Sequence, residues 1–119
     1  MCGISGVFSK EIPPKEKINL MIKTLSHRGP DDNDYKIYGN IALASCRLSI
    51  FDLSSKGKMP MEDVSKKFSI VFNGEIYNFN ELKKDFNIKT ISKTDTEVLL
   101  ELYKLKGTNC LKYLNGMFS

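Results

Sequence analysis

The sequence predicts an α+β fold, in which helices and antiparallel strands form separate layers around a hydrophobic core. Short apolar segments of strand length are mixed with segments at helical spacing, without the strand–helix–strand order of a parallel sheet. Gly39 and Asn40 separate two strand-like segments, as a two-residue hairpin turn would. With 119 residues, the chain is long enough for one such domain and too short for two.

The N-terminal segments predict a strand followed by a helix. Residues 3–8 alternate small and apolar side chains, which indicates a buried strand that begins almost at the first residue. Residues 14–26 begin at the second residue of a Pro-Pro pair and predict a helix. The apolar side chains at helical spacing in this segment are Ile18, Met21, Ile22 and Leu25.

The middle of the chain predicts a loop and then a hairpin. Residues 27–34 contain a Gly-Pro pair and three aspartates, a composition typical of a loop. Residues 35–38 and 41–50 predict the two strands that the glycine-containing turn joins. Residues 52–63 are polar and contain glycine and proline, so we expect an irregular connection there.

A strand and a short helix are expected next. Residues 68–72 are mostly apolar and predict a strand that runs straight into Asn73, Gly74 and Glu75. Residues 78–86 have the pattern of a short amphipathic helix.

The clearest helix start in the sequence is at Thr94. Thr94 and Glu97 fit a capping box, in which the Thr94 hydroxyl meets the Glu97 amide while the Glu97 carboxylate reaches back. Val98, Leu99, Leu102, Tyr103 and Leu105 are expected to form the apolar face of this helix. Gly107 is expected to end it. A last short helix over residues 109–114 leads to a strand that begins at Gly116.

Composition excludes several classes of partner. The net charge of +4 comes mostly from scattered lysines, whereas nucleic-acid grooves usually show clustered arginine beside aromatic residues. No apolar run approaches the roughly 20 residues that a membrane crossing needs. The first residues lack the pattern of a secretion signal, so we expect a cytoplasmic protein. The three cysteines and one histidine lack the close pairs typical of zinc ligands, and we expect no metal site.

Cys2 is a candidate nucleophile. Methionine aminopeptidases remove Met1 when the next residue is small, which would place a thiol and a free α-amine on one residue. An α-amine has a pKa of about 7.7–8.0, so roughly a tenth of it is free base at pH 7 and can accept the thiol proton. Two alternatives remain open at this point: an ordinary cysteine in a buried strand, or a Cys2–His27 pair.

Three further positions could bind a polar substrate. The Asn73 side chain and the Gly74 N–H can supply two donors to a developing oxyanion, although Asn-Gly is also a common turn dipeptide. Arg47 lies in an apolar segment and is suited to a carboxylate, although a solvent-facing strand arginine would look the same. Asp95 lies in the first turn of a helix, where a negative charge is favourable in any case.

Five segments, taken in order, resemble the class II glutamine amidotransferase domain of glutamine-hydrolysing asparagine synthetases. They are residues 1–8 (MCGISGVF), 27–31 (HRGPD), 47–52 (RLSIFD), 72–78 (FNGEIYN) and 94–98 (TDTEV). The resemblance covers essentially the whole chain with compatible spacing. It implies an N-terminal-nucleophile hydrolase fold, a four-layer αββα sandwich of antiparallel sheets.

The resemblance also implies the roles of the site residues. Cys2 would attack the carboxamide of L-glutamine, with its own amine as the base, and give glutamate and ammonia through a thioester. Asn73 and Gly74 would hold the oxyanion. Arg47 would bind the α-carboxylate of glutamine, while Glu75 and Asp95 would bind its α-ammonium group. The residues expected to line the pocket through backbone contacts are Leu48, Ser49, Ile50 and Phe51.

One departure from the family concerns length. Family domains continue past Gly116, so we expect residues 1–119 to be the N-terminal part of the glutaminase domain, with a sandwich incomplete at its C-terminus. The synthetase domain, which would bind ATP and Mg and accept the ammonia, is absent, and this domain needs no cofactor of its own. A homo-oligomer, a related amidotransferase with another acceptor, and an inert fragment or interaction module remain open.

Overall fold

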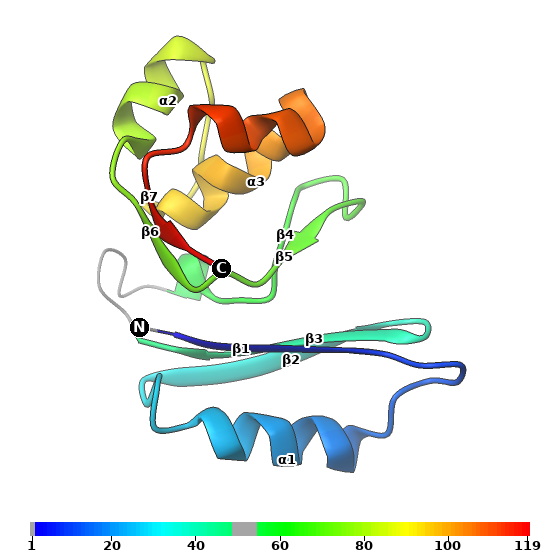
Figure 1. Ribbon diagram of the computed structural model, residues 1–119. Coiled ribbons are helices and arrows are strands. Elements are labelled where there is room, and N and C mark those ends of the chain that lie inside the picture. The colour runs from blue at the N-terminus through cyan, green and yellow to red at the C-terminus, as the bar shows by residue number, and fades with distance from the viewer. Residues whose placement is uncertain (1, 49–54) are drawn as a thin grey trace.

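Helices and antiparallel strands occupy separate layers in the computed structural model, which describes residues 2–48 and 55–119 (Figure 1). The predicted α+β class is therefore confirmed. In chain order the elements are β1 (Gly3–Phe8), α1 (Lys15–Leu25), β2 (Asp32–Tyr38), β3 (Ile41–Arg47), η1 (Ser55–Gly57), β4 (Met61–Glu62), β5 (Ser69–Ile70), β6 (Gly74–Ile76), α2 (Phe79–Asp85), α3 (Asp95–Lys106), η2 (Gly107–Tyr113) and β7 (Gly116–Phe118).

The first layer is a three-stranded antiparallel sheet in the order β1-β3-β2. Gly3 pairs with Cys46 and Phe8 with Ile41, so the start of β1 lies beside the end of β3. Helix α1 covers one face of this sheet (Figure 1). It buries Ile18 and Ile22 against Ala42, Ala44 and Cys46 of β3. The predicted first strand, first helix and hairpin are confirmed. The expected burial of the first strand is wrong, because β1 lies at the edge of the sheet and only Gly3 in it is buried.

The second half of the chain lies over the other face of this sheet (Figure 1). Two antiparallel strand pairs, β4-β5 and β6-β7, face the sheet, and α2, α3 and η2 lie on their far side. A second core joins these strands to α2, α3 and η2. Its buried members are Met59, Met61, Phe72, Ile76, Leu82, Ile88, Val98, Leu99, Leu100, Leu102 and Cys110.

A polar link joins the two halves beside the Gly39 turn. The Tyr38 hydroxyl lies 2.8 Å from Glu62 Oε1 and 2.8 Å from Ser69 Oγ. The phenol has one proton, so it donates to the carboxylate and accepts from the serine. Burial is the main cause that raises the pKa of Tyr38 to about 12. The phenol therefore stays protonated at neutral pH and keeps its role as a donor.

Helix α3 begins as predicted, but its cap differs from a simple capping box. The Glu97 N–H donates to Thr94 Oγ1 at 3.3 Å, as expected. The Glu97 carboxylate, however, accepts from the N–H groups of Ile91 and Ser92 at 2.8 and 2.6 Å. The Thr94 N–H donates to Ser92 Oγ at 3.3 Å instead. The carboxylate therefore fixes the incoming loop to the helix. Of the expected apolar face, Tyr103 and Leu105 are exposed.

Several predicted boundaries were wrong. Strand β2 begins at Asp32, inside the expected loop, because it follows β3 as far as Arg47. Strand β3 ends at Arg47, three residues before the expected end. The expected connection contains η1 and β4, and only the Ser69–Ile70 part of the strand expected over residues 68–72 is paired. The last predicted helix is the 3-10 helix η2.

Among residues 2–48 and 55–119, no helix combines the length and apolarity that a membrane crossing needs.

Candidate functional site

Cys2 immediately precedes β1 and is half-buried, whereas the other two cysteines are buried. Its Sγ atom lies 3.5 Å from the Leu48 nitrogen and 3.8 Å from the Leu48 carbonyl oxygen. The Leu48 N–H is therefore directed at the sulfur and can support negative charge on it. Burial raises the pKa of the Cys46 and Cys110 thiols, so both favour the protonated, unreactive form. Cys2 is the nucleophile candidate by exposure and contact.

The segment with the HRGPD motif fixes the backbone around Cys2. The Arg28 Nε donates to the Cys2 carbonyl oxygen at 3.3 Å, and the Asp31 N–H donates to the Arg47 carbonyl at 3.1 Å. A Cβ atom at Gly29 would overlap the backbone of Cys46 and Arg47. The sequence offered no role for this segment beyond shaping a loop. Its role here is to clamp the adjacent ends of β1 and β3.

Arg47, at the end of β3, is 7% exposed. A Cβ atom built at Gly57 would overlap the Arg47 guanidinium and lie 3.0 Å from Thr94 Cγ2. The guanidinium therefore lies against η1, close to the start of α3. The solvent-facing alternative for Arg47 is wrong.

Asp95 connects α3 to β6. The residue is 5% exposed, and its Oδ2 atom accepts from the Ile76 N–H at 2.9 Å. Burial raises the pKa of this carboxyl, and hydrogen bonds from the backbone N–H groups of Ile76 and Thr96 oppose the rise. Glu75 precedes Ile76 in β6. The hydrogen bond from Ile76 to Asp95 therefore brings the segments that contain Glu75 and Asp95 together.

Asn73 and Gly74 lie where β6 starts. The Asn73 backbone exchanges two hydrogen bonds with Ser119, at 3.1 and 2.8 Å, and Gly74 pairs with Phe118. Strand β7 therefore fixes this turn from one side. Among the described residues, no donor reaches the buried Oδ1 atom of Asn73. A buried amide oxygen without a partner is rare in folded proteins and calls for an explanation.

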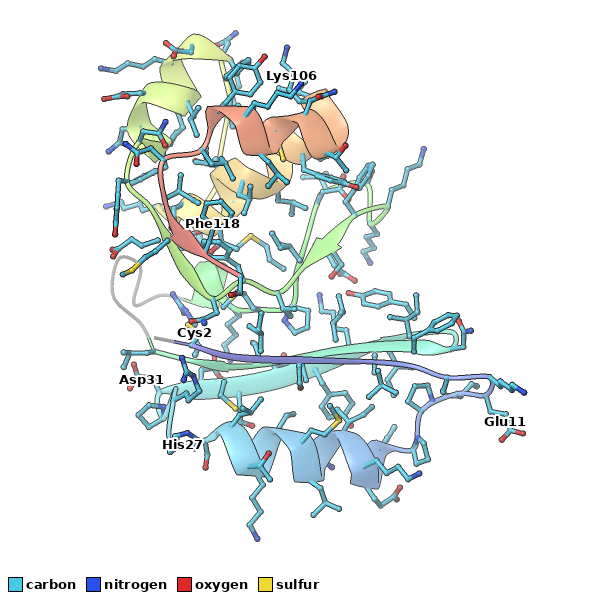
Figure 2. The ribbon with its side chains drawn as sticks, in the orientation of Figure 1. Cys2, Glu11, His27, Asp31, Lys106 and Phe118 are labelled. Carbon is cyan, nitrogen blue, oxygen red and sulfur yellow. The ribbon has the colours of Figure 1, made fainter. Side chains whose placement is uncertain are left out.

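These parts meet between the two halves of the molecule. Cys2 packs against the second core, whose members include Phe72 and Ile76 on either side of the Asn73-Gly74-Glu75 segment. Figure 2 shows Cys2 between the three-stranded sheet and the strands above it. Ser49, Ile50 and Phe51 lie outside the described residues.

Cys2 and His27, both within the described residues, do not form the alternative pair. His27 Nδ1 lies 3.0 Å from the Thr24 carbonyl oxygen, at the end of α1. Within residues 2–48 and 55–119, no three histidine, cysteine or acidic side chains gather in a group that could hold a metal ion.

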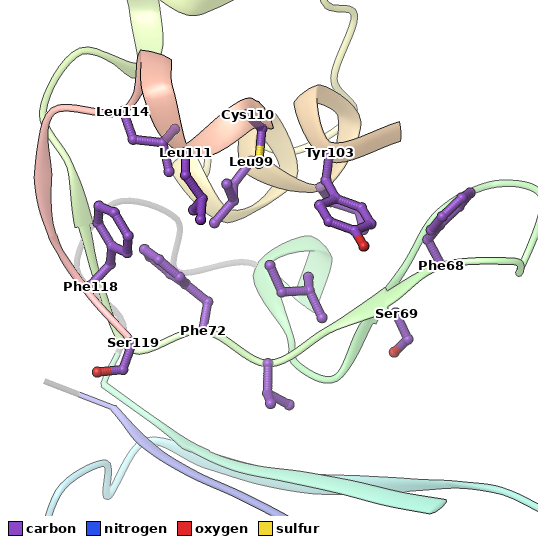
Figure 3. A pocket seen from close by; sticks show the side chains of 13 residues that line it. Phe68, Ser69, Phe72, Leu99, Tyr103, Cys110, Leu111, Leu114, Phe118 and Ser119 are labelled. Carbon is purple, nitrogen blue, oxygen red and sulfur yellow. The ribbon is translucent and has the colours of Figure 1, made fainter. Parts of the chain in front are cut away.

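A separate cavity of about 310 Å³ lies between α3, η2 and the strands near Phe72 and Phe118 (Figure 3). None of its lining residues is charged. An amino acid with both an ammonium and a carboxylate group needs charged partners, so this cavity does not suit free glutamine.

The half-buried Cys2 thiol contacts Leu48, the residue after the buried cation Arg47, and packs against the core that contains Ile76, whose N–H binds the buried Asp95 carboxylate next to the Asn73-Gly74 turn. This arrangement is suited to attack on the amide of a small zwitterion. A family model for the glutamine amidotransferase domain matches residues 1–119. The chain belongs to the glutamine amidotransferase domain family.

Three relatives of this amidotransferase domain are named as glutamine-hydrolysing asparagine synthetases. The chain is 45% identical over 139 residues to a protein of Methanocaldococcus jannaschii assigned the name asparagine synthetase 2 (glutamine-hydrolysing). It is 35% identical over 125 residues to asparagine synthetase 2 (glutamine-hydrolysing) of Bacillus subtilis, and 36% over 124 residues to asparagine synthetase B (glutamine-hydrolysing) of Escherichia coli. Each match covers 100% of this chain, but only 27%, 17% and 22% of these relatives, respectively.

Proposed function

We propose that this amidotransferase domain hydrolyses the side-chain amide of L-glutamine, with Cys2 as the nucleophile. The observation that carries the proposal is the position of the Cys2 thiol, which is half-buried and 3.5 Å from the Leu48 nitrogen, where β1 begins beside the end of β3 at Arg47. An inert interaction module would have no need of an accessible thiol with a directed N–H donor.

In the proposed reaction, removal of Met1 gives Cys2 a free α-amine, which accepts the thiol proton. The sulfur forms a bond to the carboxamide carbon, and the carbonyl oxygen becomes an oxyanion. The Asn73 side chain and the Gly74 N–H stabilise this oxyanion. The ammonium form of the amine returns its proton to the leaving nitrogen, the C–N bond breaks and ammonia departs. Water then hydrolyses the thioester to glutamate and restores the thiol.

Binding of the substrate is assigned by charge. Arg47 binds the α-carboxylate of glutamine through a paired guanidinium contact. Asp95 and Glu75 bind the α-ammonium group, and Leu48 to Phe51 complete the pocket through backbone contacts. Support comes from the burial of Arg47 and Asp95, at 7% and 5% exposure, because ionic contacts are strong only where water is excluded.

We further propose that residues 1–119 are the N-terminal part of a four-layer αββα sandwich within a longer protein. The order of α1, the three-stranded sheet, the strand pairs and the upper helices in Figure 1 supports this arrangement. The names of the relatives suggest that the ammonia is used to make asparagine in a synthetase domain that binds ATP and Mg. The thiol–amine chemistry itself needs neither a metal nor a cofactor.

The decisive test combines mass spectrometry with a coupled glutamate assay on the full-length protein expressed from its own gene. We expect Met1 to be absent and glutamate to be released from glutamine. Cys2→Ala should abolish this release, and Cys2→Ser, which keeps the amine and a weaker nucleophile, should nearly abolish it. Full activity with Met1 retained or with a blocked α-amine would refute the mechanism. No glutamate release from a correctly processed protein would favour the interaction module.

A further inference from the structure

We infer that Gly57 is a positioning residue that orients the Arg47 guanidinium for the α-carboxylate of the substrate. This inference rests on the proposed function. Gly57 ends η1 and is buried. It belongs to none of the five segments that carry the family resemblance.

The geometry around Gly57 leaves no room for a side chain. A Cβ atom there would overlap Arg47 Nη2 and lie 3.0 Å from Arg47 Cζ and from Thr94 Cγ2. Contacts below 3.4 Å are tighter than nearly all real Cβ contacts, so the guanidinium would have to move. The bare backbone of Gly57 therefore forms the wall against which the guanidinium lies.

Backbone strain does not explain the glycine. The described glycines with positive φ are Gly39, Gly74 and Gly107, and Gly57 is not among them. Alanine could therefore adopt the backbone conformation of Gly57, and the cost of Gly57→Ala arises from the side-chain contact alone.

The space beside Gly57 is shared by residues from both charged ends of the proposed substrate site. The same added Cβ would meet the Arg47 guanidinium and the methyl group of Thr94, the residue before Asp95. The nearest contact is with the guanidinium, so the carboxylate end should be disturbed most. Displacement of the guanidinium weakens its paired contact with a carboxylate, because that contact depends on geometry.

The first test is the steady-state kinetics of Gly57→Ala in the full-length protein. We expect KM for glutamine to rise about tenfold or more, which corresponds to a loss of about 1.4 kcal/mol of binding free energy. We expect kcat to stay within about twofold of the wild-type value. Gly6→Ala is the matched control, because its added Cβ would meet its nearest neighbours at 3.5 Å, an ordinary contact, and its φ is also not positive. The control should keep the wild-type KM.

A second substrate separates positioning of Arg47 from general damage. The compound 4-aminobutanamide keeps the amide and the amine of glutamine but lacks the α-carboxylate. Gly57→Ala should leave kcat/KM for 4-aminobutanamide within about twofold of wild type, because that substrate makes no use of the guanidinium. An equal loss with both substrates, or an unchanged KM for glutamine, would overturn the inference.

Thermal unfolding covers the case in which Gly57→Ala folds but is too unstable for the kinetic assay. In an Arg47→Ala background the guanidinium is gone, so adding Gly57→Ala should lower the midpoint much less than it does in the wild-type background. An equal fall of the midpoint in both backgrounds would show that the added methyl group does not clash with the Arg47 guanidinium. Absence of glutamate release by the unmodified protein would instead refute the proposed function, so the two failures are distinct.

Discussion

Asp95→Ala should lower the free energy of unfolding by about 1–3 kcal/mol, whereas Asp95→Asn should leave it at or above the wild-type value at neutral pH. The Ile76 residue is 1% exposed, and its N–H donates to Asp95 Oδ2 at 2.9 Å. Alanine leaves this buried donor without an acceptor, which typically costs about 1–3 kcal/mol. Asparagine keeps an oxygen there and removes only the charge.

The charge of Asp95 is subject to two opposing effects. Its place at the start of α3 favours a negative charge by about 0.3–1 kcal/mol. Burial disfavours the charge and is the largest cause of the raised pKa of the Asp95 carboxyl, ahead of the hydrogen bonds that oppose it. A charge that folding disfavours lowers stability at pH 7, so its removal in Asp95→Asn is expected to be neutral or stabilising.

The sign of the pH dependence follows from this raised pKa. The folded state holds the Asp95 proton more tightly than the unfolded state, whose Asp pKa is about 3.9. The contribution of this group to stability is therefore largest below about pH 3.9 and is lost as the pH rises through the folded pKa. Asp95→Asn lacks this loss, so its stability relative to wild type should improve from acid to neutral pH.

Urea unfolding followed by circular dichroism measures these differences. Asp85→Asn is a suitable control, because Asp85 is exposed at the end of α2 and surface changes usually fall within about 0.5 kcal/mol. The reasoning would be refuted if Asp95→Asn unfolded as readily as Asp95→Ala, or if its stability relative to wild type worsened from acid to neutral pH.

The same two variants test the substrate role of Asp95. Both lack the charge proposed to bind the α-ammonium group, so both should raise KM for glutamine. Glutaramate has the amide and the carboxylate of glutamine but no amine, and its kcat/KM should be similar for wild type and Asp95→Asn. A variant that is as stable as wild type but binds glutamine poorly would separate binding from folding.

Three further substitutions have defined outcomes. Asn73→Ala should lower kcat for glutamine by about 10²–10³, as the loss of one oxyanion donor does, and a near-wild-type rate in the glutamate assay would contradict that role. Arg47→Lys should mainly raise KM, because lysine cannot make the paired contact, and a large fall in kcat at unchanged KM would argue against it. Gly29→Ala should lower the free energy of unfolding by about 1–3 kcal/mol in urea melts, since its Cβ would overlap rigid backbone of β3. Gly6→Ala should change the free energy of unfolding little. An equal loss in Gly6→Ala and Gly29→Ala would contradict the explanation by overlap at Gly29.

The elements that local pattern determines were predictable from the sequence. Residues 3–8 alternate along a strand that packs one face on α1, and the proline before α1 and Thr94 before α3 mark real helix starts. These signals act between residues that are close in sequence. Short-range patterns therefore suffice to detect them.

The pairings that build the site were not predictable in this way. Strand β6 has only three residues and is defined by its pairing with β7, far along the chain. The two-residue strand β4 is likewise defined by its partner β5. The contacts of Arg28 with Cys2 and of Gly57 with Arg47 depend on how the halves are packed, and no local spacing encodes them. The sequence suggested the chemistry of these positions, and tertiary packing brought them together.

The hydrogen bonds of Tyr38 hold the two halves of the molecule together at one end, and this attachment depends on pH. It lies at the Phe8 end of the sheet, away from Cys2, and it depends on a phenol proton shared with the Glu62 carboxylate. Its contribution to stability is present in full below about pH 10 and is lost as the pH rises through about 12. Above that range the phenolate and the carboxylate repel each other. Strong alkali should therefore separate the β4-β5 hairpin from the three-stranded sheet at this end first.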